Sequence, residues 1–307
     1  MEGISFSVDE GEFFGFLGPN GAGKSTTIKV LTTLLKKTSG RVSVSGYDLD
    51  KSPEDIRRSM GVLTQETSLD VDLTGWENLH LQGRLQQLHG KELDERISEL
   101  LKLVQLEDVA KKLVGRYSGG MRKRLDLASA LIHNPKLLFL DEPTTGLDAQ
   151  SRTAIWEYLD DLNKNHGITI FLTTQYLEEA DRLCRQLSII DHGKLIAKGS
   201  PSELKEALGG DTIALTLVPS VRTKAKEVLS KIQGIYSVID SEEGVAAYAK
   251  NAGQIVTEVV TTLDRNDIHP SFLSLSSPTL DDVFLEKTGR RIRSEELQRK
   301  ETEPFLM

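Results

Sequence analysis

Short apolar runs alternate with amphipathic stretches along the N-terminal two thirds of the chain. The runs at 13–17, 137–140, 168–173 and 187–190 are short and largely apolar, as expected of strands buried on both faces. Between residues 74 and 113 the pattern is almost wholly helical, and Leu93, Ile97, Leu100, Leu101 and Val104 recur at three- and four-residue spacing. Strands that alternate with helices predict an α/β fold with a largely parallel sheet.

Two further strand patterns flank this region. Ile4, Phe6 and Val8 alternate with polar residues, which predicts a strand followed by a turn. The run at 187–190 is followed by a polar turn and a second apolar run at 195–197, which predicts a hairpin.

The pattern changes after Gly209 and Gly210, where we expect a domain boundary. Residues 211–276 read strand, helix, strand, strand, helix, strand, the order of a small α+β ferredoxin-like domain. Leu280, Val283 and Phe284 then predict a short amphipathic helix. We expect its apolar face to dock as a hydrophobic anchor, and one hypothesis is that it docks on a neighbouring subunit. The expected domains are 1–208, 211–288 as an accessory domain, and a charged, mobile tail at 289–307.

Composition and charge narrow the class of protein. The chain has 307 residues and a net charge of -8, which argues against a nucleic-acid partner because that role needs a basic surface. Cys184 is the only cysteine, which excludes an internal disulfide and a cysteine-based zinc cluster and fits a reducing, cytoplasmic compartment. No apolar run is long enough to span a bilayer and the start lacks a signal-peptide pattern, so we expect any membrane role to require a partner.

A glycine-rich loop follows the apolar run at 13–17. Gly18, Gly23, Lys24 and Ser25 satisfy the spacing of a phosphate-binding loop between a strand and a helix. Glycines let backbone N–H groups turn toward phosphate oxygens, and the helix N-terminus adds partial positive charge. Lys24 would reach the β- and γ-phosphates and the Ser25 hydroxyl would bind Mg²⁺. The sequence therefore predicts a nucleotide site for ATP and Mg²⁺.

Two carboxylates end the apolar run at 137–140. In a parallel sheet this end lies beside the phosphate loop, so Asp141 can hold Mg²⁺ and Glu142 can accept a proton from an attacking water. A second glycine motif, Ser118, Gly119 and Gly120, precedes a helical stretch, where Ser118 is a natural N-cap and the glycines leave N–H groups open to an anion.

Together these motifs closely resemble the ATP-binding subunit of ABC transporters, in family order. Gln65 matches the Q-loop, Tyr117 to Met121 the signature, Asp141 and Glu142 the end of Walker B, and Gly146 to Asp148 the D-loop. Walker A comprises Gly18, Pro19, Asn20, Gly21, Ala22, Gly23, Lys24, Ser25 and Thr26. The signature variant, the stretch from Thr173 to Ala180 and that from Thr279 to Phe284 are most similar to daunorubicin/doxorubicin-resistance exporter ATPases, and coverage runs from residue 3 to about 288.

The resemblance implies a head-to-tail homodimer with two ATP molecules at its interface. Ser118 and Gly120 would contact the γ-phosphate held by the facing subunit, with Gly119 between them, and Asp148 would contact that subunit. Gln65 would sense Mg²⁺ and the attacking water near a groove for an integral-membrane permease. It further implies a protein on the cytoplasmic face of the membrane that powers export of a drug- or lipid-like compound.

Two departures from the family keep alternatives open. Gln175 stands where the family usually places a histidine that braces the γ-phosphate, and glutamine carries neither a proton nor a positive charge. The family's usual adenine-stacking aromatic residue would lie upstream of Gly3, so we expect either that the sequence is truncated at its start or that adenine binding is looser and less base-selective. The alternative function is a nucleotide-gated regulatory module with little turnover, against which the presence of Glu142 argues.

Overall fold

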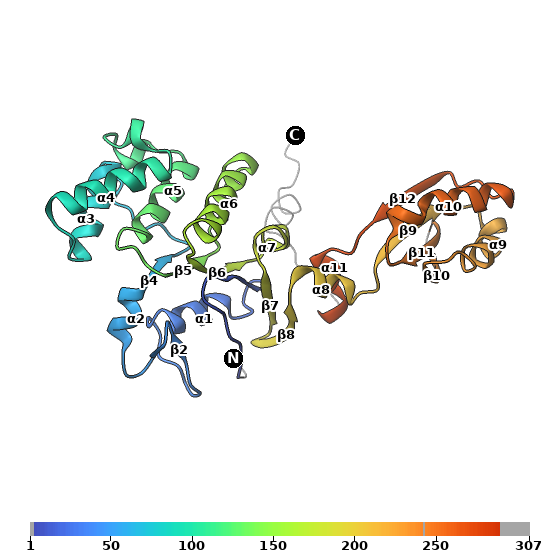
Figure 1. The fold of residues 1–307 in the computed structure, drawn as a ribbon, viewed down its shortest axis with the longest axis horizontal. Helices are drawn as coiled ribbons and strands as arrows, with labels where there is room; N and C mark the ends of the chain where they lie inside the picture. Colours follow the sequence, from blue (N-terminus) through green and yellow to red (C-terminus); the bar gives the residue numbers. More distant parts are fainter. Residues whose placement is uncertain (1–2, 242, 289–307) are drawn as a thin grey trace, which may run out of the picture. The chain divides into compact units, whose positions relative to one another are not determined.

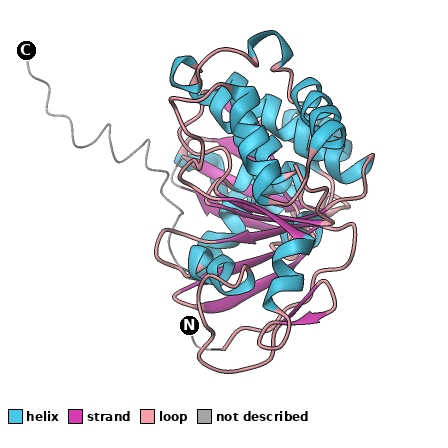
Figure 2. Ribbon diagram, turned by 90° about the vertical axis from the view of Figure 1, so that its left-hand side faces the viewer, coloured by secondary structure: helices cyan, strands magenta, loops and turns pink. Residues whose placement is uncertain are grey.

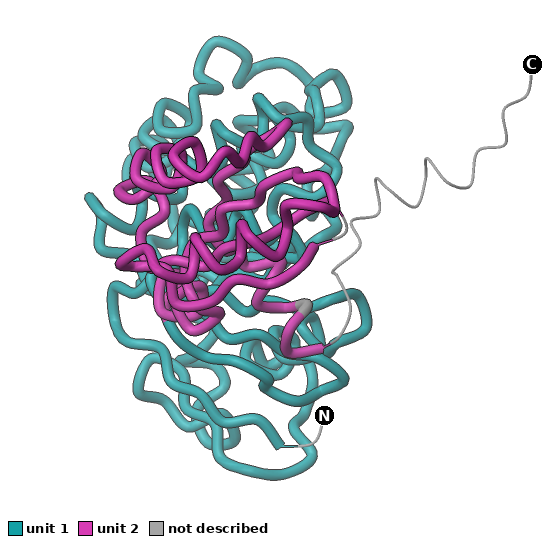
Figure 3. Tube along the Cα trace, turned by 90° about the vertical axis from the view of Figure 1, so that its right-hand side faces the viewer, with its two compact units in different colours: residues 1–199, 292–307 teal, residues 200–291 magenta. Residues whose placement is uncertain are grey.

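The computed structural model describes residues 3–241 and 243–288, and the predicted tail at 289–307 lies outside the described residues. The described part of the chain divides into two compact units, which meet in sequence between residues 199 and 200 (Figure 3). The first unit contains every motif of the predicted nucleotide site.

The first unit is built on a six-stranded sheet with the order β4-β5-β6-β1-β7-β8. The strands are β1 (Phe13–Leu17), β4 (Met60–Leu63), β5 (Leu137–Asp141), β6 (Thr169–Thr174), β7 (Gln186–Asp191) and β8 (Lys194–Gly199). Neighbouring strands from β4 to β7 are parallel, and β8 pairs antiparallel with β7. Every residue of β1 and β6 is buried, as a parallel sheet covered on both faces requires. The predicted α/β fold, the largely parallel sheet and the final hairpin are confirmed.

Helices lie on both sides of this sheet (Figure 2). They are α1 (Lys24–Leu31), α2 (Pro53–Ser59), α3 (Gly75–Leu85), α4 (Gly90–Leu103), α5 (Gly119–Ala130), α6 (Ala149–Lys164) and α7 (Leu177–Leu183), with a small hairpin of β2 (Ser43–Val44) and β3 (Tyr47–Asp48). Single 3₁₀ turns occupy Glu107–Val109 and Val114–Arg116. The predicted stripe at 93–104 is buried and α4 contacts α3 and α5, so much of the region between 74 and 113 is helical, with turns at 86–89, 104–106 and 110–113.

The expected N-terminal strand is wrong. Residues 3–9 form no strand, although Ile4, Phe6 and Val8 are half-buried and the residues between them are exposed. Phe6 lies 5.8 Å from Phe14 and 5.9 Å from Phe171, ring centre to ring centre. The alternation arises because an extended segment packs every second side chain on the aromatic cluster without joining the ladder of backbone hydrogen bonds.

The second unit contains the predicted ferredoxin-like arrangement. Its elements are α8 (Pro201–Glu206), β9 (Asp211–Thr216), α9 (Pro219–Leu229), β10 (Ile235–Ser241), β11 (Gly244–Ala249), α10 (Ala252–Arg265), β12 (Phe272–Ser276) and α11 (Leu280–Thr288), drawn in yellow to red in Figure 1. The strands form an antiparallel sheet in the order β10-β11-β9-β12. Alternate residues of β9 and β11 share one core with Leu229 of α9 and Val259 of α10, because side chains at every second strand position face the helices.

No helix in the described part of the chain combines the length and the apolar character that crossing a membrane requires.

Candidate functional site

The phosphate-binding loop connects β1 to α1, as its spacing predicts. A Cβ on Gly18 would overlap the backbone oxygen of Ile190, so only glycine fits beside β7 there. Gly23 adopts a left-handed φ of 113° at the N-cap of α1, which glycine tolerates and side chains rarely do. The Ala22 N–H donates to Pro19 O at 3.2 Å and closes the turn. Asn20, Gly21 and Thr26 are exposed.

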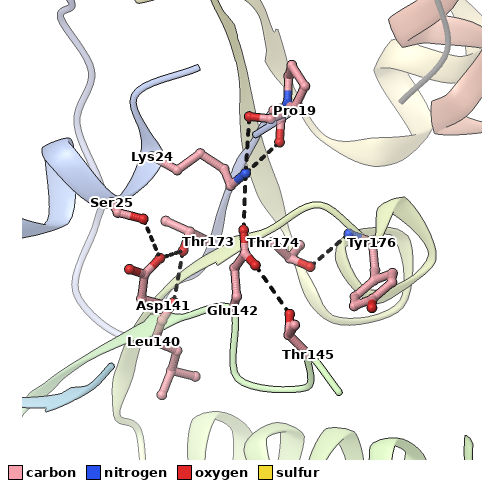
Figure 4. Close-up of polar contacts among 11 residues, drawn as sticks. Pro19, Lys24, Ser25, Leu140, Asp141, Glu142, Thr145, Thr173, Thr174 and Tyr176 are labelled. Carbon is pink, nitrogen blue, oxygen red and sulfur yellow. Dashed lines mark hydrogen bonds and ion pairs between the residues drawn. The ribbon is translucent and has the colours of Figure 1, made fainter. Parts of the chain in front are cut away.

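Lys24 reaches back across this loop. Its Nζ donates to Gly18 O at 2.7 Å and to Pro19 O at 3.3 Å, and lies 3.2 Å from Glu142 Oε1 (Figure 4). The lysine is only 4% exposed, so three oxygens compensate for the burial of its charge. The loop lysine and the second carboxylate therefore meet at one point.

The two carboxylates at the end of β5 face different partners. Asp141 Oδ1 accepts from Ser25 Oγ at 3.3 Å and from Thr173 Oγ1 of the adjacent β6 at 2.6 Å (Figure 4). Glu142 has a left-handed φ of 51°, an uncommon conformation for a residue with a side chain. Its Oε2 accepts from Thr145 Oγ1 at 3.2 Å. The reversal of the backbone turns Glu142 toward Lys24 while Asp141 faces Ser25.

A second group of predicted residues lies at the starts of α5 and α6. Ser118 caps α5 by accepting from the Met121 N–H at 3.2 Å. Asp148 caps α6 by accepting from the Ser151 N–H at 2.9 Å and from Ser151 Oγ at 2.7 Å. These two hydrogen bonds lower the pKa of Asp148, and the backbone bond has the larger effect. A Cβ on Gly120 would lie 2.7 Å from Ser151 Oγ, so the two helix starts are in close contact there.

The two glutamines lie at the ends of other strands. Gln65 is exposed two residues beyond β4, and the carbonyl of the preceding Thr64 accepts from Lys123 Nζ of α5 at 3.0 Å. Gln175 directly follows β6 and is only 5% exposed. Thr173, two residues before Gln175, donates a hydrogen bond to Asp141, and the sequence analysis did not identify this role. The only sequence signal for it is a hydroxyl at the end of β6, and this signal has a meaning only once β6 is known to lie beside β5.

The structure therefore brings Lys24, Ser25, Asp141 and Glu142 together, and separately brings Ser118, Gly120 and Asp148 together. The first group offers a cation, a hydroxyl and two carboxylates around a glycine loop, a combination that suits a nucleoside triphosphate with Mg²⁺. The second offers two helix N-termini, where backbone N–H groups attract anions.

Comparisons with known proteins agree with this geometry. Residues 1–145 match the "ABC transporter" family, and residues 199–288 match the family described as "ATP-binding protein DrrA1-3-like, C-terminal domain". The chain is 41% identical to the daunorubicin resistance ATP-binding protein DrrA2 of Streptomyces coeruleorubidus, over 96% of this chain and 92% of that one. It is 37% identical to the linearmycin resistance ATP-binding protein LnrL of Bacillus subtilis (95% and 94%) and 38% identical to the Nod factor export ATP-binding protein I of Ralstonia nicotianae (95% and 90%).

Solved structures of ABC cassettes share the fold of the first unit. CbiO1 from Clostridium perfringens, part of the ABC transporter complex cbiONQ, aligns with a TM-score of 0.62 at 30% identity, over 66% of this chain and 82% of that one. The dimeric, post-hydrolysis ATP-binding cassette MJ0796 with ADP and Pi aligns with a TM-score of 0.58 at 29% identity, over 64% and 88%. The chain thus belongs to the ATP-binding proteins of ABC transporters and is an ATP-binding P-loop ATPase that carries a DrrA1-3-like C-terminal domain.

Proposed function

We propose that this protein dimerises around two ATP molecules, hydrolyses them, and so drives export of a drug- or lipid-like hydrophobic compound through a separate membrane permease. The observation that carries the proposal is the meeting of Lys24 with Glu142, beside Ser25 and Asp141, at the phosphate loop. A residue set for binding alone has no need of a second carboxylate at this position.

Each residue of the first group has a part in the reaction. Phosphate oxygens would replace Gly18 O and Pro19 O as acceptors for Lys24 Nζ, which offsets the charge that develops on the γ-phosphate. Glu142, held by Thr145 and turned by its backbone, would take a proton from the attacking water. Gln175, at the end of β6, would donate a hydrogen bond to the γ-phosphate or to that water.

The oxygens of Ser25 and Asp141 fit Mg²⁺, which binds through hard oxygen ligands and usually only one or two carboxylates. Among the described residues no group of three or more His, Cys, Asp or Glu could hold a metal, so nucleotide phosphates and water would complete this coordination. Mg²⁺ would neutralise charge on the β- and γ-phosphates. Gln65 would approach the same ion from the end of β4.

Dimerisation would supply the second group from a facing copy. Ser118, Gly119, Gly120 and Asp148 lie at helix N-termini, and these would close on the phosphates bound by the other copy's Walker A loop. A dimeric cassette among the structural relatives supports this arrangement. One sequence relative is named for daunorubicin resistance and another for Nod factor export, which supports outward transport, and a permease partner would hold the protein on the cytoplasmic face of the membrane.

Mg²⁺-dependent ATP hydrolysis by the purified protein, with and without its membrane partner, tests the proposal. We expect turnover in the wild type and a loss of about 10²-fold or more in Glu142→Gln, with ATP still bound, because the general base is removed. Glu157→Gln, at an exposed position on α6, is the matched control and should retain full activity. ATP binding without wild-type turnover in either setting would instead support a nucleotide-gated regulatory module, with Gln175 as its cause.

A further inference from the structure

A glutamate on α7 is completely buried. Glu179 is 0% exposed and lies four residues beyond Gln175, whereas the adjacent Glu178 is exposed. Burial of a carboxyl group is unfavourable unless hydrogen bonds replace the lost water. The contacts of Glu179 therefore indicate why this position holds a polar side chain at all.

Two donors from other segments meet one oxygen of Glu179. Oε1 accepts from Thr144 Oγ1 at 3.0 Å and from the indole Nε1 of Trp156 at 2.8 Å. Thr144 is 1% and Trp156 4% exposed, so the whole group is shielded from water. In this surrounding each bond is stronger than at a surface, and loss of the shared acceptor would leave two buried donors without a partner.

The acceptor, rather than a charge, is what these contacts require. Burial raises the pKa of Glu179, against smaller opposing effects of the Thr174, Trp156 and Thr144 side chains and of Arg152. Arg152 is itself placed over aromatic rings, with its guanidinium carbon 5.3 Å from the centre of the Tyr176 ring. A glutamine at position 179 would offer the same acceptor without a carboxyl group.

The segments that meet at Glu179 carry the reacting groups of the proposed site. Thr144 follows Glu142 by two residues, and its neighbour Thr145 donates to Glu142 Oε2. Helix α7 begins two residues after Gln175 and packs against α6, the helix that contains Trp156 and is capped by Asp148 (Figure 1). The Glu142 N–H also donates to Thr173 O at 3.0 Å, so the two strand ends are adjacent.

We propose that Glu179 is a positioning residue for ATP hydrolysis, whose Oε1 holds the Glu142 segment, the Gln175 segment and α6 in fixed relation. This inference rests on the proposed function. Glu142 needs such support because its left-handed backbone is inherently unfavourable and persists only where neighbouring structure maintains it.

The kinetic consequence is specific. A displacement of about 1 Å in a reacting group can cost about 10²-fold in rate. The donors to Glu179 Oε1 are Thr144 and Trp156, neither of which belongs to the phosphate-binding loop. Loss of this acceptor should therefore lower kcat and leave ATP affinity nearly unchanged. A residue needed only for folding would instead reduce the amount of active protein and its melting temperature, with no effect on turnover per folded molecule.

Four variants test this in the full-length protein: Glu179→Gln, Glu179→Leu, Thr144→Val and the double variant Glu179→Leu/Thr144→Val, with Glu178→Leu as the matched control. Steady-state kcat and KM for ATP, equilibrium ATP binding and thermal unfolding are measured for each. We expect Glu179→Gln to stay within about 3-fold of wild-type kcat, and Glu179→Leu and Thr144→Val each to lose about 10-fold or more with KM nearly unchanged. Because both substitutions remove the same hydrogen bond, the kcat of the double variant should be little lower than that of the less active single variant.

Several outcomes would overturn the inference. Wild-type kcat in Glu179→Leu and in Thr144→Val would remove the positioning role and leave the proposed function intact. A loss in Glu179→Gln equal to that in Glu179→Leu would show that the carboxyl group itself acts. If Glu179→Leu fails to fold, Thr144→Val still decides, because it removes one donor at nearly constant volume. Absence of wild-type turnover would overturn both proposals.

Discussion

Gln175 stands at the position where the resemblance to ABC ATPases leads us to expect a histidine. It lies almost fully buried directly after β6, beside the strand end that carries Asp141 and Glu142. A glutamine can donate a hydrogen bond to a phosphate oxygen but has no titratable proton. Its contribution should therefore be that of a neutral donor.

Replacement of Gln175 tests this in two directions. We expect Gln175→Ala to reduce kcat by about 10²-fold, the usual effect of removing one donor to a developing charge, with ATP binding retained. Gln175→His should hydrolyse ATP, and its kcat should change with pH around a midpoint of about 6.5, where imidazole gains its proton as pH falls. The wild type should lack this change. The measurement is kcat between pH 5.5 and 8.5 for the three proteins, corrected for ATP and Mg²⁺ speciation.

The control for that series is the wild type itself, whose profile over this range should contain no step assignable to position 175. Equal kcat in Gln175→Ala and wild type would mean that the side chain plays no part in the chemistry. An identical profile in Gln175→His and wild type would place the imidazole away from the reacting phosphate.

At the same scale, sequence spacing predicts only part of the site. Lys24, Ser25, Asp141 and Glu142 are recognisable because each occupies a fixed place at the end of a strand or the start of a helix. Their assignments as binding and catalytic groups remain predictions until activity is measured. The Thr144–Glu179 and Trp156–Glu179 contacts span 35 and 23 positions, and no local pattern encodes such distances.

Helix α11 illustrates the same limit for a whole element. Its apolar positions led to the hypothesis of an anchor for a neighbouring subunit, but Leu280, Val283 and Phe284 are all buried within the single chain. The helix packs against α8, and Thr279 caps it through the Asp282 N–H. An amphipathic pattern gives the face that is buried and leaves open what covers it.

Phe284→Ala should therefore destabilise the monomer. We expect a loss of about 3–5 kcal/mol in the free energy of unfolding, because removal of a fully buried aromatic ring leaves a cavity. Phe272→Ala, in the same unit but 65% exposed, should change stability by less than about 0.5 kcal/mol. Urea unfolding followed by circular dichroism measures both.

Normal stability of Phe284→Ala, with a weaker dimer, would restore the hypothesis that α11 anchors a neighbouring subunit.

The N-terminal segment shows how alternation can mislead in a similar way. Ile4, Phe6 and Val8 have the period of a strand, yet their side chains pack on the aromatic cluster while the backbone forms no ladder. In contrast, β1 was predicted to its end residues, because a run buried on both faces has few alternatives before a glycine loop.

For the molecule as a whole, the predicted nucleotide contacts form two separate groups. Lys24, at the start of α1, meets Glu142, directly after β5, and Ser118 and Asp148 lie at the starts of α5 and α6. If dimerisation joins the groups in trans, each complete site combines Lys24 of one copy with Ser118 of the other. Two inactive variants, each defective in a different group, should then complement each other.

The test uses Lys24→Ala and Ser118→Asp, both in a Glu142→Gln background that we expect to retain bound ATP. Ser118→Asp keeps the helix cap, because aspartate is a favourable N-cap, but places a negative charge toward the phosphate. Ser118→Asn is the neutral control and should still dimerise with ATP. A mixed dimer contains one site with both defects and one site with neither, so mixing should restore an ATP-dependent dimer with one retained nucleotide.

Size-exclusion chromatography with quantification of bound ATP measures this directly. Neither variant alone should form the dimer, and the mixture should contain about one ATP for each restored pair, since only one of its two sites is intact. If both groups instead served one nucleotide within the same copy, every copy in the mixture would remain defective and no dimer would appear. Restoration thus depends on the trans arrangement, and its absence alongside normal dimerisation of Ser118→Asn would exclude the head-to-tail sandwich.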